Sequence, residues 1–425
     1  MNKGRKEIDM TKLLILGAAG DMGSYALKLS TKFDLYTHIT LGDINEKRAR
    51  ELMEEIKDPR LDFERVDAYN HDELVKLMQQ YDIIISAIGP FYIFGPLVTS
   101  AAIKSRRPLI DICDDYGPTI EILKMDEDAK EIGVPIFLGY GWTPGTTNIL
   151  TRYGYNKLDK DSPIKCNISW AGGAADSEGL AVVLHVLYAV TGKVPSYLNG
   201  KMIDVLAGDG FEKVEFPAPL NDVTVFDCGH PEPVTIPKYL ENIEECTLKG
   251  GLTPEWNNNF AAGLKGLGLI NTPKMQKFFG KIIHKFEAIF EKGGGIEASS
   301  ARVDLWGKLD GKNVHLAYAT PSIPMGELTG YPAAITAKLF AEGKISGTGI
   351  IPPEVQDPKL FLDELEKIGI KMVYDDDGQL KRLKKNRKIQ KPKGKHIAWS
   401  ALLVLLGLVP LAIIATIIAL LIVLI

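Results

Sequence analysis

Short apolar runs alternate with amphipathic stretches over the first 150 residues of the chain. The stretches between the runs, residues 21–33, 45–56, 71–80, 95–105 and 118–132, place apolar side chains at helical spacing. The apolar runs are LLILG, THITLGD, FERVDA, DIIISAIG, PLIDICD and PIFLGYG. Strands that alternate with helices, and strand cores as apolar as IIISAI, are typical of a parallel sheet covered on both faces. Residues 11–150 are therefore predicted to form a doubly wound α/β domain.

The pattern changes after residue 150. Strand-like pieces such as CNISWAGGAAD, TVFDCGHPEPVTI and EECTLKGGLT are separated by Gly and Pro turns, with few helical stretches between them. Asp310-Gly311 is a typical hairpin turn inside ARVDLWGKLDGKNVHLAYAT. Residues 151–330 are predicted to be a second, α+β domain with an antiparallel or mixed sheet, and residues 331–374 to contribute further helices.

The two ends of the chain differ from its body. Residues 1–10 are a polar tail, and residues 375–396 are a polar and then basic linker. Residues 381–396 hold nine Lys or Arg and no acid, whereas the whole chain carries a net charge of −4. Residues 397–425 contain no charged side chain and exceed the roughly 20 residues that span a bilayer. The sequence thus predicts a C-terminal transmembrane anchor with residues 1–396 in the cytoplasm, since basic residues flank the cytoplasmic side.

Composition and residue spacing argue against a nucleic-acid partner and against a metal site. With a net charge of −4 and 24% charged residues, the chain has no global signal for nucleic acid. The four cysteines and seven histidines form no paired spacing that is typical of metal ligands, so no metal site is predicted. The expected partners are a small-molecule substrate and the membrane, and self-association of the chain is left open.

A glycine-rich motif follows the first predicted strand. Gly17-Ala18-Ala19-Gly20-Asp21-Met22-Gly23 has the form Gly-x-x-Gly-x-x-Gly and precedes the first predicted helix. Small residues let a backbone approach a pyrophosphate, whose charge meets amide groups and the positive end of the helix dipole. The alternative is a plain strand-to-helix turn, but the strand, the helix and an acid after the second strand favour a dinucleotide site. Asp21 is interpreted as a helix N-cap.

The acid after the second strand indicates which dinucleotide binds. Asp43 suits the hydroxyls of an adenosine ribose and repels a 2′-phosphate, which favours NAD over NADP. Lys47 and Arg48 follow closely and leave NADP open, although their positions also fit a solvated helix face.

Several ordered motifs together resemble one enzyme family. IGPFYIFGPLV, LIDICDDYGP, GYGWTPGTTNIL, GHPEPVTIP and GTGIIPPEV are similar to segments of the saccharopine dehydrogenase-like oxidoreductases, over about residues 12–372. The resemblance implies an N-terminal Rossmann domain, an inserted substrate domain and nicotinamide-dependent redox chemistry at a carbon–nitrogen bond. By position it implies a cofactor set of Gly17, Ala19, Gly20, Asp21, Met22, Gly23, Asp43, Ala87, Ile88 and Gly89.

The resemblance also implies a loop beside the nicotinamide. Thr143, Pro144 and Gly145 match the family's Gly-x-x-Pro-Gly loop, and Asn148 follows on the same segment as a substrate candidate. Trp142 and Thr143 stand where a Leu-Asp pair is associated with true saccharopine enzymes. This departure leaves the substrate open.

Candidate acid–base groups follow the fifth predicted strand. Asp114 and Asp115 are adjacent carboxylates, where mutual repulsion raises one pKa toward neutral, although both positions also suit helix capping. His230 and Tyr116 are weaker candidates, and Arg152 or Arg302 could hold a substrate carboxylate.

The sequence as a whole predicts a membrane-anchored NAD(P)-dependent oxidoreductase that acts on an amine or imine of a small amino-acid-like molecule. Two alternatives stay open. One is a catalytically inactive dinucleotide sensor or scaffold at the membrane. The other is an oxidoreductase with a lipid-linked substrate, because an anchor confines the enzyme to the surface where such molecules lie.

Overall fold

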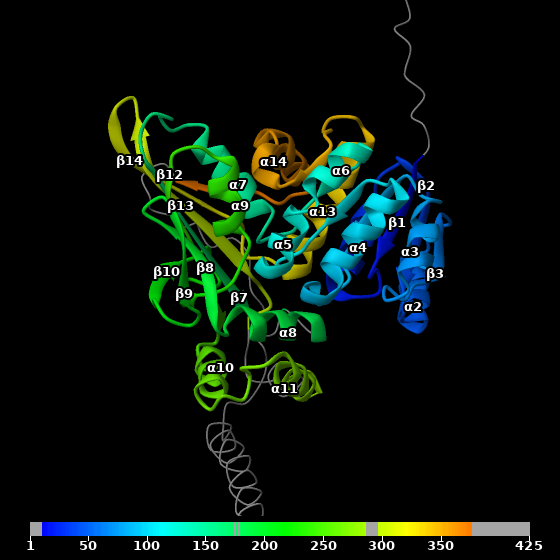
Figure 1. Ribbon diagram of the computed structural model, residues 1–425, viewed down its shortest axis with the longest axis horizontal. Coiled ribbons are helices and arrows are strands. Elements are labelled where there is room, and N and C mark those ends of the chain that lie inside the picture. Colours follow the sequence, from blue (N-terminus) through cyan, green and yellow to red (C-terminus); the bar gives the residue numbers. More distant parts are fainter. Residues whose placement is uncertain (1–10, 174–175, 177–178, 286–295, 376–425) are drawn as a thin grey trace, which may run out of the picture. The chain divides into compact units, whose positions relative to one another are not determined.

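The computed structural model describes residues 11–173, 176, 179–285 and 296–375, which build two sheets and the helices packed on them (Figure 1). All of these residues belong to one compact unit, Met1–Arg382. The predicted transmembrane anchor at residues 397–425 and nearly all of the predicted linker lie outside the described residues. Within the described part, the helices are too short or too polar to cross a bilayer.

The first sheet has seven strands in the order β15-β6-β5-β4-β1-β2-β3, and every pair in it is parallel. The parallel α/β sheet predicted from the alternating pattern is confirmed. Its seventh strand, β15, was not predicted, because three residues near the end of the chain carry no readable pattern. The strands are β1 (Thr11–Leu16), β2 (Tyr36–Asp43), β3 (Leu61–Arg65), β4 (Ile83–Ser86), β5 (Leu109–Asp111), β6 (Pro135–Phe137) and β15 (Gly349–Ile351).

Helices cover both faces of this sheet. Side chains along β1 alternate between two separate cores: Leu13 and Ile15 belong to one, and Leu14 and Leu16 to the other. Helices α1 and α13 pack together on the first core, and α3 and α4 cover the second. The helices of this half are α1 (Asp21–Ser30), α2 (Glu46–Ile56), α3 (His71–Met78), α4 (Phe91–Ser105), α5 (Tyr116–Leu123), α6 (Asp126–Ile132), α13 (Met325–Ala341) and α14 (Pro358–Lys367).

The second sheet has nine strands and is mixed. Strands β7 and β12 run parallel, and the other pairs are antiparallel. The hairpin β13–β14 turns at Asp310 and Gly311, both in the left-handed region, as predicted for that pair. The strands are β7 (Ile164–Gly173), β8 (Lys193–Leu198), β9 (Lys201–Leu206), β10 (Glu212–Glu215), β11 (Asp222–Asp227), β12 (Ile243–Thr253), β13 (Ser300–Leu309), β14 (Lys312–Ala319) and β16 (Val373–Asp375).

The second half is richer in helices than the sequence predicted. GHPEPVTI, interpreted as strand-like, contains helix α9, because prolines in a first turn favour helix initiation. Helix α11 packs on α8, as Figure 1 shows. The helices and the one short 3-10 turn described here are α7 (Thr146–Tyr155), α8 (Leu180–Ala189), α9 (Glu232–Tyr239), α10 (Trp256–Gly266), α11 (Pro273–Lys285) and η1 (Pro353–Val355).

Two local predictions in the first half were wrong. Residues 118–132 form two helices, α5 and α6, because Asp126 and its two acidic successors favour a new helix N-terminus there. The N-cap of α1 is Gly20, and Asp21 is the first helical residue, so Asp21 is not the cap.

Candidate functional site

The glycine-rich loop joins β1 to α1 with almost no side-chain volume. Gly17 has φ +76°, and a Cβ there would lie 2.7 Å from the Ala87 carbonyl oxygen at the end of β4. A Cβ on Gly23 would lie 2.1 Å from the Gly17 carbonyl oxygen, so α1 packs directly on the loop. Because the first-turn amides of a helix lack intrahelical acceptors, this closely packed start of α1 is fitted to hold a pyrophosphate.

Asp43 ends β2 beside this loop, where the sequence placed it. Its Oδ2 accepts a hydrogen bond from the Ala19 amide at 2.9 Å, and its Oδ1 accepts one from the Asn45 amide at 2.9 Å. The carboxylate therefore orders the loop, and the ribose contact predicted for it stays a prediction. Arg48 lies 3.1 Å from Glu55 and 3.4 Å from Glu51, so its guanidinium is paired along its own helix.

A cavity of about 410 Å³ begins at this loop and continues between the two sheets. Gly20 and Met22 from the loop and first helix, and Ala87 and Gly89 from the end of β4, line one part of its wall. Of the other residues predicted for the site, Asp21, Asp114, Thr143 and Pro144 also line it. The other predicted site residues do not line the cavity: they are Gly17, Ala19, Gly23, Asp43, Ile88, Asp115, Gly145 and Asn148.

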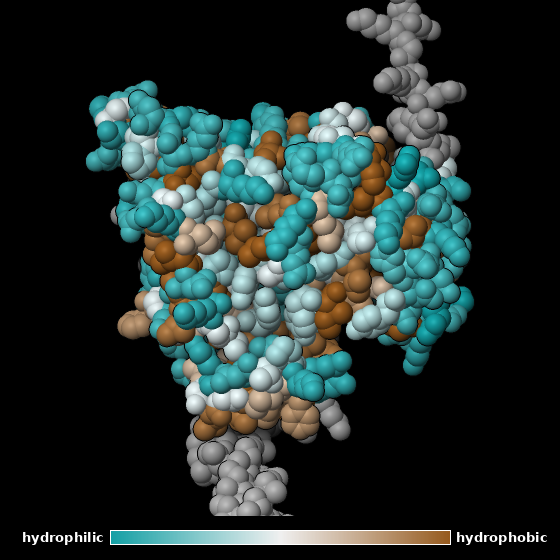
Figure 2. Space-filling view, viewed as in Figure 1, coloured by the Kyte–Doolittle hydropathy of each residue, from teal (hydrophilic) through white to brown (hydrophobic). Residues whose placement is uncertain are grey.

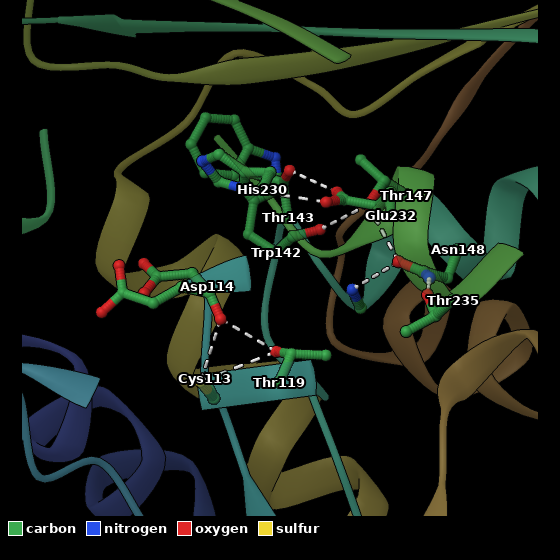
Figure 3. Close-up of polar contacts among 12 residues, drawn as sticks. Cys113, Asp114, Thr119, Trp142, Thr143, Thr147, Asn148, His230, Glu232 and Thr235 are labelled. Atoms are coloured by element: carbon green, nitrogen blue, oxygen red, sulfur yellow. Dashed lines mark hydrogen bonds and ion pairs between the residues drawn. The ribbon is translucent and has the colours of Figure 1, made fainter. Parts of the chain in front are cut away.

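The loop before α7 is held from behind by buried polar groups (Figure 3). Thr143 and Thr147 donate from their hydroxyls to Glu232 Oε1, at 2.6 and 2.9 Å. Asn148 accepts from the Gly145 amide at 3.0 Å and donates to Glu354 at 2.9 Å. Gly145 and Asn148 are thus buried and support the loop, whereas Thr143 and Pro144 form the part of the loop that lines the cavity.

A chain of hydrogen bonds joins the loop after β5, which carries Asp114 and Asp115, to helix α8. The Asp115 carboxylate accepts from the Tyr92 amide at 3.0 Å and lies 2.9 Å from His185 Nδ1. Asp114 Oδ1 is 3.3 Å from the same nitrogen. The other face of the imidazole, Nε2, lies 3.2 Å from His230 Nε2. Asp114, His185 and His230 all line the cavity, so the chain reaches the space where a substrate would bind.

The protonation of this chain is set by burial and by its own charges. Burial raises the pKa of Asp114 to about 6. Burial by itself lowers the pKa of His185, but the Asp114 and Asp115 carboxylates outweigh it and raise the pKa to about 9. Asp111, buried at the end of β5, has its pKa raised to about 7 by burial. The cavity therefore holds a proton-carrying imidazole beside an ionisable carboxylate near neutral pH.

His185 was missed by sequence reasoning. Its signal was present: it is the one polar side chain before Tyr188 in the apolar helix LAVVLHVLYA. Ligand atoms of Asp114, Asp115 and His185 lie within 4.8 Å of one another, a grouping typical of metal ligands that the histidine spacing did not show. Each of these side chains is already engaged in the hydrogen-bonded and ion-paired chain.

The two arginines proposed to hold a substrate carboxylate lie elsewhere. Arg302 is buried on β13 and forms two bonds of 2.7 Å with Asp304. Arg152 lies on α7 with its guanidinium over the Tyr155 ring. Among the described residues that line the cavity, none is Lys or Arg.

The fold and the glycine loop define a dinucleotide-binding α/β protein in which a second sheet closes the far side of the cavity. Residues 13–137 match the family model described as the saccharopine dehydrogenase NADP binding domain. The cofactor is therefore a nicotinamide dinucleotide, NAD or NADP, as predicted.

Whole-chain comparisons agree with this class. A carboxyaminopropylagmatine dehydrogenase of Synechocystis sp. is 19% identical over 393 residues, which cover 85% of this chain and 96% of that protein. The saccharopine dehydrogenase (L-Glu forming) of Saccharomyces cerevisiae superposes with a TM-score of 0.62 at 14% identity, over 86% of this chain and 100% of the other. The homospermidine synthase of Legionella pneumophila, in complex with NAD, superposes with a TM-score of 0.57 at 11% identity, over 92% and 96%. The two superpositions show a shared fold.

Proposed function

We propose that this protein is an NAD(P)-dependent oxidoreductase that oxidises an amine, or reduces an imine, of a small amino-acid-like or polyamine-like molecule. The observation that carries the proposal is the hydrogen-bonded chain of Asp115, His185 and His230 at the wall of the cavity that starts at the dinucleotide loop. The names of the Synechocystis and Legionella proteins, which refer to polyamine-type molecules, support the substrate class.

The charges of the cavity suit a nitrogen base. A protonated amine or iminium is cationic, and the Asp114 carboxylate lines the cavity within 3.3 Å of His185. A substrate carboxylate finds no Lys or Arg among the described lining residues. The site therefore recognises the nitrogen end of its substrate, and any carboxylate of an amino-acid-like molecule points away from this wall.

When bound, the nicotinamide supplies or accepts the hydride at the carbon of the carbon–nitrogen bond. In the reductive direction the nitrogen needs one proton. His185 gives it from Nε2, when the substrate nitrogen replaces His230 as the acceptor, while Asp115 keeps the proton on Nδ1. Asp114 stabilises the cationic nitrogen, so both are proposed as catalytic residues. Asp115 is a positioning residue, since it contacts His185 Nδ1 and the Tyr92 amide and does not line the cavity. Thr143 and Pro144 close the wall beside the nicotinamide.

We further propose that residues 397–425 anchor the protein in a membrane with the catalytic part in the cytoplasm. The support is the uncharged length of that segment and the basic cluster before it.

The function is tested with the full-length protein, both coenzymes and a panel of amines, imines and aldehydes, by following nicotinamide absorbance. His185→Gln should lower kcat about 10²-fold or more, because it removes a general acid, while calorimetry still shows coenzyme binding. His38→Gln is the matched control, since His38 is half-buried on β2 and pairs with Asp62. Coenzyme binding with no turnover of any compound would instead favour the sensor.

A further inference from the structure

The cavity has two ends of opposite chemistry. Asp114, His185 and His230 gather at one end. Most of the remaining wall on the side of the second sheet is apolar and comes from α8, β12, α10 and α11, with Asn257 as a polar exception on α10. Its apolar residues are Val183, Leu187, Leu252, Phe260, Leu264 and Ile283. These apolar side chains form an apolar arm of the cavity.

Helix α8 forms part of both ends. Leu184 is buried, with 4% of its surface exposed, and does not line the cavity, but Val183 and Val186 stay half-exposed because they face it. Helix α10 packs against the same helix through Leu264, and α11 does so through Phe279 and Ile283. An apolar ligand that covers this exposed apolar surface removes it from water, which favours binding.

The arm also reaches the outside of the molecule. Phe260 lines the cavity and is 42% exposed, so the apolar wall is continuous with the surface at α10. A ligand can therefore have its polar head at His185 and an apolar tail that extends toward α10.

Resting on the amine–imine redox chemistry proposed above, but with a substrate larger than the small molecule named there, we propose that the substrate's nitrogen is attached to a hydrocarbon chain, and that this chain occupies the apolar arm. The class is a long-chain amine or imine. Each methylene that enters the arm adds about fourfold in affinity, until the arm is filled.

The test measures binding, so it is independent of turnover. The full-length protein, saturated with coenzyme, is titrated by calorimetry with straight-chain amines from propylamine to decylamine, and detergent-only titrations are subtracted. We expect Kd to fall about fourfold per methylene and then to level off. A Kd that stays flat along the series overturns the chain proposal, whereas the amine oxidoreductase function fails only if no amine is turned over.

A matched pair of variants locates the chain. Ala261 lines the arm, and its neighbour Ala262 on the same helix is exposed and does not line it. Ala261→Trp should reduce the affinity ratio of decylamine to propylamine at least about tenfold, because it fills the arm, and Ala262→Trp should leave the ratio at its wild-type value. Equal ratios for the two variants would place the chain elsewhere and overturn the proposal.

The outer face of α10 and α11 combines basic and apolar side chains. Residues 256–285 contain five Lys and no Asp or Glu, in a chain whose net charge is −4. The same stretch exposes large apolar side chains, namely Phe260 at 42%, Leu267 at 64%, Phe278 at 61% and Ile282 at 39%. In Figure 2, apolar residues gather on the part of the surface that α10 and α11 occupy in Figure 1.

The exposed face of α11 alternates lysines with apolar residues. Lys274, Phe278 and Lys281 follow at helical spacing, with Lys277 and Ile282 beside them, and all five are exposed. A helix of this composition lies in the interface of a bilayer, where its apolar side chains enter the lipid and its lysines meet anionic headgroups. We infer that the α10–α11 face docks on an anionic membrane surface, beside the opening of the apolar arm.

The docking face is tested in the full-length protein with site-specific probes. The four native cysteines are buried, so a single introduced cysteine can be labelled selectively. Phe278→Cys carries an environment-sensitive dye, and Tyr69→Cys, at a 64% exposed position near α3, is the control. The proteins are reconstituted into vesicles of phosphatidylcholine with or without phosphatidylserine. We expect the dye at position 278 to be protected several-fold from an aqueous quencher, most strongly with phosphatidylserine.

Charge reversal completes this test. Exchanging Lys274, Lys277 and Lys281 for Glu should abolish the protection that phosphatidylserine adds. Equal quenching of the two dyes in phosphatidylserine vesicles overturns the membrane proposal. Protection at position 278 that persists in detergent without lipid also overturns it, and assigns the face to a second copy or to the C-terminal segment of the chain.

Discussion

The Nε2 atoms of His185 and His230 lie 3.2 Å apart, so one ring donates a hydrogen bond to the other. His185 is charged at neutral pH and carries protons on both nitrogens, since its pKa is raised to about 9. His230 must then accept at Nε2 and carry its own proton on Nδ1, which faces Glu232 Oε2 at 3.7 Å. The carboxylates at the two ends of the chain thereby fix the direction of its hydrogen bonds and hold the ionised imidazole at the cavity wall.

The first prediction concerns the pH dependence of imine reduction. The reaction needs Asp114 ionised, which is lost as the pH falls through about 6, and His185 protonated, which is lost as the pH rises through about 9. A plot of kcat/KM against pH should therefore be bell-shaped with limbs near these two values. Initial rates of nicotinamide oxidation in a constant-ionic-strength buffer series measure it.

Asp114→Asn identifies the acidic limb. The variant should lose that limb and keep the alkaline one, because only the carboxylate has been removed. An acidic limb that persists in Asp114→Asn would assign it to another group, and Asp111, whose pKa is raised to about 7, is the next carboxyl to test.

The second prediction separates positioning from catalysis at Asp115. In Asp115→Asn the imidazole of His185 loses one of the carboxylates that raise its pKa, so the alkaline limb should move to lower pH. We expect kcat to fall about 10²-fold while KM changes little, because Asp115 does not line the cavity. Thr119→Val is a useful control, since its hydroxyl donates to the Asp115 main-chain oxygen and not to its carboxylate. An unmoved alkaline limb in Asp115→Asn would contradict the positioning role.

The third prediction concerns the start of α1. Gly23→Ala places a methyl group 2.1 Å from the Gly17 carbonyl oxygen, so the helix must move away from the loop. Coenzyme affinity should fall at least about tenfold, because displaced first-turn amides no longer meet the pyrophosphate. Gly263→Ala, on helix α10 with open space around the added methyl, should bind coenzyme as the wild type does. Calorimetry with NAD and NADP measures both, and circular dichroism verifies that the fold is kept.

The contrast between Gly17 and His185 explains what the sequence could predict. Gly17 and the residues after it form one continuous strand–turn–helix unit, so spacing along the chain is also spacing in space. His185 meets Asp115 across 70 positions of sequence, on a helix whose apolar pattern indicates only burial. The pairing depends on how the second sheet packs against the first, and no local pattern encodes that. For the same reason the three-residue strand β15, which joins β6 far away in the sequence, could not be predicted.

The fourth prediction concerns coenzyme choice at Asp43. Removing its negative charge removes the repulsion toward a 2′-phosphate, so Asp43→Asn should shift the ratio of NAD to NADP affinity toward NADP by about tenfold. The affinity for NAD itself should fall as well, because the carboxylate accepts the Ala19 amide within the loop. Asp62→Asn, an exposed aspartate on the neighbouring strand, should leave both affinities unchanged. A wild type that prefers NADP would instead assign the 2′-phosphate to Lys47 or Arg48.

The fifth prediction concerns Arg302, which the structure places in a buried pair with Asp304 instead of at the cavity. Arg302→Leu leaves the Asp304 carboxylate buried with His315 as its remaining partner, so the protein should lose about 3 kcal/mol of stability. KM and coenzyme affinity should stay at wild-type values, since Arg302 does not line the cavity. Chemical denaturation followed by fluorescence measures the loss, and the double variant with Asp304→Leu should recover part of it, because the buried Asp304 carboxylate is then removed together with its guanidinium partner. A raised KM in a variant of undiminished stability would place the guanidinium against the substrate after all.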